Sequence, residues 1–167
     1  MRAAIVAVGR LKDGPERVLA LRYHERAEAL GRQIGVSGLD LVEVPESRAR
    51  READRRREEA EAIAARLGPR SALVAFDERG ASPTSEAFAA DLEGFRDGGR
   101  ALLALVIGGP DGLDPPLRAR ADRVISFGRL TLPHQLVRVL AAEQLYRAWT
   151  ILARHPYHRA GEEPAGR

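Results

Sequence analysis

The stretch ALLALVIGGPDGL, residues 101–113, joins an apolar run to a glycine-rich turn. The run has the length and composition of a strand buried on both faces of a parallel sheet. Gly108 and Gly109 leave the backbone open to a ligand, and we expect any side chain at Gly109 to project into the space of that ligand. A tight turn is the alternative interpretation, because Pro-Asp-Gly is a strong turn signal. The stretch lacks the lysine of a P-loop and the three-glycine dinucleotide pattern.

Four further segments have the apolar pattern of strands. They are residues 3–8, 39–44, 71–76 and 123–127, and helical patterns occupy residues 15–32, 48–67, 85–96 and 133–153. Strands that alternate with helices predict an α/β domain with a mostly parallel sheet and helices on both faces. In such sheets a ligand binds beyond the carboxyl ends of the strands. The segments 76–80, 108–113 and 128–134 are therefore the predicted site.

The composition narrows the classes of protein and of chemistry. The 167 residues suffice for one domain, 44% of them are hydrophobic, and the formal net charge of +3 permits a nucleic-acid partner. The chain has no cysteine, which excludes disulfides, thiolate metal sites and cysteine nucleophiles. The N-terminal apolar run is too short for a signal peptide, and no run reaches membrane-spanning length. We therefore expect a cytoplasmic protein with no membrane contact.

The stretch SFGRLTLPHQLVRVLAAEQLYRAW, residues 126–149, predicts a loop followed by a long helix. Pro133 suits the first turn of that helix, and Thr131 or Leu132 is expected at its cap. The apolar stripe is wider than one sheet contact requires and includes Trp149 and Leu152, so we expect a homodimer that buries part of it.

A charge-dense segment, residues 48–61, precedes the third strand. Its acids and arginines suit a solvated helix with pairs such as Glu52–Arg56 and Arg57–Glu61, which is the favoured interpretation. The alternative is that its more basic beginning touches a phosphate backbone.

The last patterned stretch is HPYHR, residues 155–159. A frayed chain end is the simplest interpretation. No acid or cysteine lies near the two histidines in the sequence, so we expect no metal site. Pro156 stiffens the segment, and its polar side chains are of types that bind a nucleotide.

Three of these stretches together, LLALVIGGPDGL, LTLPHQLVRVLAAEQLYRAW and HPYHR, closely resemble the ribosomal large subunit methyltransferase H family of the SPOUT superfamily. The likeness covers nearly the whole chain, including the start AAIVAVGRLKD, and is weakest in the arginine-rich middle. It implies an α/β fold with a C-terminal trefoil knot, a homodimer, and transfer of a methyl group from S-adenosylmethionine to N3 of a pseudouridine in 23S rRNA. A small domain of this kind is expected to act on the assembled ribosome.

The resemblance also implies roles for particular residues. In the cofactor pocket it places Phe76, Gly108, Gly109, Gly128, Arg129, Leu130, Thr131, Leu132 and Pro133. The tail is associated with substrate binding and methyl transfer. There His158 is a candidate proton acceptor, Tyr157 can stack on the base, and Arg159 and Arg147 can stabilise an anionic base or bind phosphate.

The expected domain spans residues 1–159. Residues 160–167 extend beyond the usual end of the family, and their small and polar composition predicts a disordered tail. A methyltransferase of the same knotted class that acts on tRNA, and a non-enzymatic RNA-binding factor with a degenerate pocket, are the alternatives. A flavodoxin-like or nucleotide-hydrolysing protein is a more distant one, because phosphate-binding motifs are missing.

Overall fold

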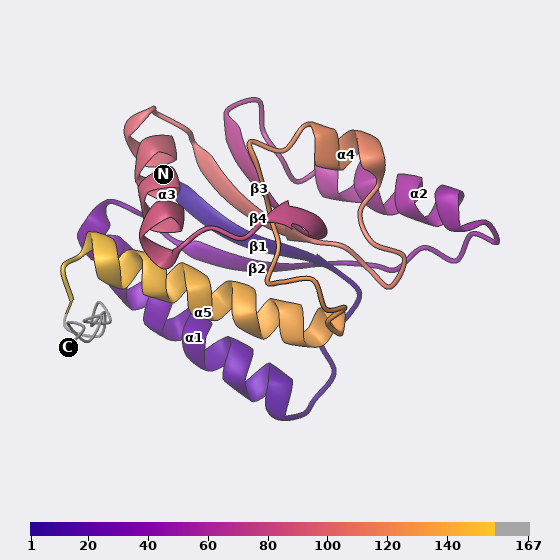
Figure 1. Ribbon diagram of the computed structural model, residues 1–167, viewed down its shortest axis with the longest axis horizontal. Coiled ribbons are helices and arrows are strands. Elements are labelled where there is room, and N and C mark those ends of the chain that lie inside the picture. Colours follow the sequence, from indigo (N-terminus) through magenta and orange to yellow (C-terminus); the bar gives the residue numbers. More distant parts are fainter. Residues whose placement is uncertain (156–167) are drawn as a thin grey trace, which may run out of the picture.

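The computed structural model describes residues 1–155, which fold around a parallel sheet (Figure 1). Within this part of the chain the strands stand in the order β2-β1-β4-β3-β5, and every neighbouring pair is parallel. The strands are β1 (Arg2–Val8), β2 (Leu39–Val44), β3 (Ser71–Ala81), β4 (Leu102–Ile107) and β5 (Arg123–Ile125). The predicted α/β class and parallel sheet are confirmed.

The burial of the central strand β4 explains why the sequence indicated it as a continuous apolar run. It pairs with β1 on one side and β3 on the other, and Leu103, Ala104, Leu105 and Val106 are fully buried. With helices on both faces of the sheet, no position of such a strand faces water, so the run shows no polar alternation.

Helices cover both faces, as predicted (Figure 1). On one face, α1 (Pro15–Gly31), α3 (Ser85–Asp97) and α5 (His134–Leu152) share a core with the sheet. On the other face, α2 (Glu52–Ala64) and the short α4 (Pro115–Ala119) share a second core. A 3-10 turn, Arg32–Ile34, ends the α1 region. The helix α4 was not predicted, because one turn carries too little periodic signal.

Strand β3 continues beyond its predicted end at Phe76 to Ala81. The extension is polar at its start, so its pattern does not indicate a strand, yet Ala81 pairs with Ile125 of β5 after a shift of register. At Gly80 a Cβ atom would lie 2.6 Å from the backbone of Ile125. The two segments pass each other so closely that only glycine fits there.

The helix α5 differs from expectation in two respects. Its N-cap is Pro133 and not Thr131 or Leu132, and no side chain caps it. Trp149 is 1% exposed, and a Cβ atom on Gly31 of α1 would lie 2.8 Å from its ring. Trp149 therefore belongs to the core of one chain and is not available to a partner. The wide stripe is used within one chain, since α5 packs on α1, α3 and the sheet together.

Candidate active site

A cavity of about 260 Å³ lies where β3, β4 and β5 end, at the edge of the sheet that the sequence indicated. It is closed by the loop that leads into α5 and by the first turn of that helix. The predicted cofactor residues that line it are Phe76, Gly108, Gly109, Gly128, Leu130, Thr131 and Leu132. Arg129 and Pro133 belong to the same loop but do not line the cavity.

The glycine segment after β4 is both a tight turn and a wall of the cavity. The N–H of Gly112 donates to the carbonyl of Gly109 at 2.9 Å, and Gly112 has a φ of +81°. A Cβ atom on Gly108 would lie 2.8 Å from the backbone of Gly112. From the sequence, a tight turn and a backbone open to a ligand were alternative interpretations of this segment. The segment forms a tight turn, and its backbone also lines the cavity.

The expectation that a side chain at Gly109 would project into the ligand's space is wrong. Its Cβ atom would lie 2.9 Å from Cγ1 of Val8 and 3.2 Å from Oε2 of Glu59, and neither residue lines the cavity. Gly109 is therefore required by packing behind the loop. The cavity-facing side of this position is bare backbone in any case.

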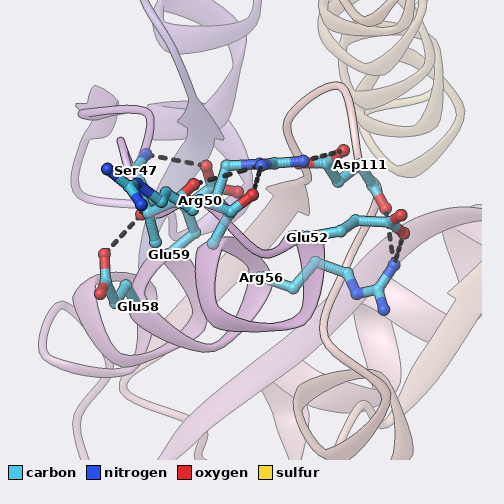
Figure 2. A network of polar contacts seen from close by, with 9 residues as sticks. Ser47, Arg50, Glu52, Arg56, Glu58, Glu59 and Asp111 are labelled. Carbon is cyan, nitrogen blue, oxygen red and sulfur yellow. Dashed lines mark hydrogen bonds and ion pairs between the residues drawn. The ribbon is translucent and has the colours of Figure 1, made fainter.

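Asp111 of this loop is held by arginines from α2 (Figure 2). Arg55 contacts both carboxylate oxygens, from Nε to Oδ2 at 2.6 Å and from Nη2 to Oδ1 at 3.0 Å. Arg56 reaches the carbonyl of Asp111 at 3.5 Å and pairs with Glu52. The hydrogen bonds from Arg55 lower the pKa of the Asp111 carboxyl below its ordinary value, so Asp111 is ionised at neutral pH.

A buried carboxyl group lies behind the same loop. Glu59 of α2 is 5% exposed, and its Oε1 accepts the N–H of Ser47 at 2.9 Å. Its Oε2 has no hydrogen-bond partner among the described residues. Burial is the main cause that raises the pKa of Glu59 above its ordinary value, with a further contribution from Asp111.

The loop after β5 is shaped by a serine that was not predicted. The hydroxyl of Ser126 donates to the carbonyl of Gly128 at 2.7 Å and accepts the N–H of Gly128 at 3.1 Å. Gly128 has a φ of +128°, which side chains rarely tolerate. Beside this turn, the rings of Phe76 and Phe127 stack with centroids 5.0 Å apart. These contacts set the path of the predicted cofactor loop.

Asp77 is a second cavity residue that was not singled out. Its side chain is 5% exposed, and Oδ2 accepts Nη1 of Arg118 at 3.1 Å while Oδ1 accepts the N–H of Arg79. The rule that ligands bind at strand ends pointed to the segment but not to this residue. Its partner Arg118 lies on the short helix α4, which had no sequence signal.

The predicted catalytic residues do not gather at this cavity within the described chain. Arg147 pairs with Glu143 on α5, about 20 Å along the helix from the cavity-lining His134. His155 is exposed just after α5, and its N–H donates to the carbonyl of Thr150. Tyr157, His158 and Arg159 lie outside the described residues.

A second cavity, of about 390 Å³, lies between α1, α5 and the first two strands. It contains none of the predicted site residues. Its buried Arg138 donates from Nη2 to the carbonyls of Val8 and Gly9, at 2.5 and 2.7 Å. Burial lowers the pKa of Arg138 from its ordinary value, and these contacts give it a structural role in anchoring the end of β1 to α5.

Comparison with known proteins defines the class. A family model described as predicted SPOUT methyltransferase matches residues 1–158, so the chain belongs to the SPOUT methyltransferases. Within that class it belongs to the ribosomal RNA large subunit methyltransferase H family. The protein of that name from Methylorubrum populi is 60% identical over 164 residues, with 98% of this chain and 99% of that protein covered. The one from Bradyrhizobium sp. is 56% identical over 160 residues, covering 96% and 99%.

Among solved structures, a probable methyltransferase from Bordetella pertussis Tohama I has 18% sequence identity and a TM-score of 0.49, covering 88% of this chain and 95% of its own. This likeness is too distant to refine the family assignment. In the part of the chain that the structure describes, no helix has the length and apolar character needed to cross a membrane.

Proposed function

We propose that this protein transfers a methyl group from S-adenosylmethionine to N3 of a pseudouridine in the 23S rRNA of the large ribosomal subunit. The observation that carries the proposal is the cavity formed by three post-strand loops in a chain that shares 60% identity with a large subunit rRNA methyltransferase. The names of the relatives indicate that the substrate is ribosomal RNA, and the cavity is the proposed binding site of the methyl donor.

The cavity suits the proposed cofactor in its chemistry. When bound, S-adenosylmethionine supplies a methyl group made electrophilic by a sulfonium cation. The bare backbone at Gly108 and Gly128 offers peptide groups for a polar ligand, and Phe127, Leu132 and Val137 offer an apolar wall.

The reaction requires removal of a proton, because N3 of the base is an imide nitrogen that is mostly protonated at neutral pH. We assign this step to His158, because histidine is the side chain type suited to proton transfer at neutral pH. Arg159 stabilises the anionic base, and Tyr157 stacks on it. Holding the base in line with the methyl group contributes further, by up to about 10 kcal/mol in ideal cases.

The helix α5 carries the chain away from the cavity before these residues. The helix α5 begins at the cavity with His134 and ends at Leu152, about 27 Å away. From His155 a fully extended chain covers only about 11 Å to reach His158, whatever its conformation. Figure 1 places the two ends of α5 on opposite sides of the domain. We therefore propose a homodimer in which each tail serves the partner's cavity.

Exposed apolar side chains support a partner surface near the cavity. Leu130 is 82% exposed, Val18 59%, Leu136 42% and Leu19 36%. They come from the loop before α5 and from the first turns of α1 and α5, and these helices run side by side in the same direction (Figure 1). Exposed apolar groups of this size favour association. We take this surface as the candidate interface.

The rest of the proposal concerns the chain's organisation. Residues 1–159 act as the single catalytic domain, and residues 160–167 are an extension beyond it. We include in the proposal the C-terminal trefoil knot that the family resemblance implies. A ribosomal substrate places the protein in the cytoplasm.

The proposal is tested by incubating the protein with radiolabelled S-adenosylmethionine and with large ribosomal subunits, complete ribosomes or tRNA transcripts. We expect label in 23S rRNA alone, and mapping by nuclease digestion and mass spectrometry should locate it on N3 of a pseudouridine. The variant Thr131→Trp, which places a bulky side chain in the loop that lines the cavity, is the negative control. Label in tRNA alone would instead establish the tRNA enzyme. Failure to bind S-adenosylhomocysteine would favour a non-enzymatic factor.

A further inference from the structure

We propose that residues 48–51, here called the arginine arm, bind the phosphate backbone of the substrate RNA beside the cofactor loop. We further propose that Arg55 fixes this arm relative to the loop. The proposal rests on the proposed function in that RNA is the substrate, and it adds where the RNA backbone lies on the protein.

The arm carries cations that the rest of the charged segment does not neutralise. Arg48, Arg50 and Arg51 are exposed and form no ion pair within residues 1–155. The acids that follow them are already engaged. Glu52 pairs with Arg56, Asp54 and Glu61 pair with Arg57, and Glu58 accepts the hydroxyl of Ser47. The solvated-helix interpretation is confirmed for α2, including the expected pairs Glu52–Arg56 and Arg57–Glu61. The helix begins only at Glu52, so residues 48–51 precede it and are not part of it.

These cations lie where the helix dipole opposes them, and the two acids of the first turn of α2, Glu52 and Asp54, already pair with Arg56 and Arg57. The arm ends at Arg51, the N-cap of α2, where the helix dipole presents a partial positive charge. Cations near a helix N-terminus are destabilised by that dipole, whereas a phosphate there is stabilised by it and by the free N–H groups. A bound phosphate backbone would offset both the dipole and the mutual repulsion of the arginines.

One guanidinium ties the arm to the cofactor loop (Figure 2). Nη1 of Arg55 donates to the carbonyl oxygens of Ala49 and Arg50 at 3.2 and 3.1 Å. The other nitrogens of the same group contact Asp111, which lines the cavity. The arm therefore stands at the rim of the cavity, where the backbone of an RNA that presents a base to the methyl donor must pass.

The composition of the arm favours RNA over other anionic partners. Arginine presents a planar set of donors that matches phosphate oxygens. The only neutral member of the arm is Ala49, so it lacks the apolar anchors that hold a peripheral protein in a membrane. The alternative is that the arm binds an acidic protein. The salt dependence of RNA binding and competition by polyglutamate distinguish the two partners.

The test compares two triple variants that lose the same charge. The arm variant is Arg48→Gln/Arg50→Gln/Arg51→Gln. The control is Arg66→Gln/Arg70→Gln/Arg120→Gln, whose arginines are equally exposed and form no ion pair among the described residues. The control residues lie near the starts of β3 and β5, at the edge of the sheet opposite the cavity. Both variants should keep the wild-type melting temperature and affinity for S-adenosylhomocysteine within about twofold, because neither removes a contact of the cavity.

Binding to purified 23S rRNA is measured by filter retention between about 50 and 200 mM salt, and methylation of large subunits is measured separately. We expect the arm variant to bind RNA at least about tenfold more weakly. Its slope of log affinity against log salt should be smaller by about 2, since roughly 0.7–0.9 is lost per phosphate contact. The control should stay within about threefold of wild type. An acidic polypeptide, polyglutamate, should compete poorly.

Equal RNA affinity of the arm and control variants would overturn the proposal. It would also be overturned if the wild-type protein bound no RNA, or if it bound polyglutamate more tightly than RNA. The proposed function fails in a different way, namely by the absence of methyl incorporation into large subunits by the wild type. The comparison of RNA binding between the two triple variants does not depend on whether the wild type methylates large subunits.

Discussion

Arg55 and Asp111 lie 56 positions apart in the chain and form a two-point contact, with both carboxylate oxygens held by one guanidinium at 2.6 and 3.0 Å. This contact joins α2 to the glycine loop after β4. It also holds the residues before α2, through the carbonyls of Ala49 and Arg50. A single side chain thus contacts both the glycine loop and the arginine arm.

Replacing Arg55 by lysine should weaken cofactor binding while keeping the charge. Lysine cannot reproduce the planar two-point contact, so the loop at Asp111 gains freedom that a ligand must remove. We expect the affinity for S-adenosylhomocysteine, measured by calorimetry, to fall about fivefold. Arg57→Lys is the matched control, because among residues 1–155 Arg57 pairs only with Asp54 and Glu61. An unchanged affinity in Arg55→Lys would show that the loop holds its shape unaided.

Glu59→Gln should stabilise the protein at neutral pH. Because burial raises the pKa of Glu59 in the fold, the folded state binds its proton more tightly than the unfolded state does. Stability from this group is therefore present below the unfolded pKa and is lost as pH rises through the folded pKa. Glutamine keeps an oxygen for the N–H of Ser47 without the buried charge.

The melting temperatures of wild type and Glu59→Gln are compared at pH 4 and pH 8. The advantage of the variant should be larger at pH 8. A constant difference at the two pH values would contradict the raised pKa, and so would a destabilised variant at pH 8.

Gly80→Ala should destabilise the fold because its methyl group would lie 2.6 Å from the backbone of Ile125, which cannot move aside as a side chain can. Overpacking of this kind costs about 1–3 kcal/mol. Gly94→Ala is the control, since a Cβ atom there meets nothing within 4 Å and the site is in the helix α3. It should gain about 0.5–1 kcal/mol. Denaturant unfolding measures both, and equal stabilities would disprove the close passage.

The in-trans tail predicts complementation between two inactive chains. A chain truncated after His155 retains the cavity, and Thr131→Trp retains the tail. Each chain alone should methylate poorly, because the first lacks the tail and the second has an altered cavity. In an equal mixture about half of the dimers are heterodimers with one complete site each, so methylation should recover to about a quarter of the wild-type level per protomer. Sedimentation should show a dimer for both. If subunits exchange but methylation does not recover, the tail and the cavity of each site belong to the same chain.

The proton acceptor can be identified by the pH dependence of tail variants. His158→Ala and Arg159→Ala should both lower the methylation rate strongly. Only His158→Ala should recover part of its activity at high pH, where N3 loses its proton without a base. If recovery is confined to Arg159→Ala, the proton chemistry belongs to another group.

The sequence by itself determined the layout of strands and helices. The buried strands of a parallel sheet are continuous apolar runs, so β2 (Leu39–Val44) was bounded correctly and β4 within one residue. It also indicated the cavity, because strands that run in one direction bring their carboxyl ends to one edge. Seven of the residues assigned to the cofactor pocket by family resemblance line that cavity.

Tertiary structure alone decided which distant side chains meet. Nothing local in the sequence pairs Arg55 with Asp111, Arg118 with Asp77, or Gly31 with Trp149, because these contacts depend on how helices are placed over the sheet. The same placement turned the wide stripe of α5 inward. It also set the end of α5 about 27 Å from the cavity, a distance fixed by the rise and direction of a rigid helix, which no pattern of residues in the tail could reveal.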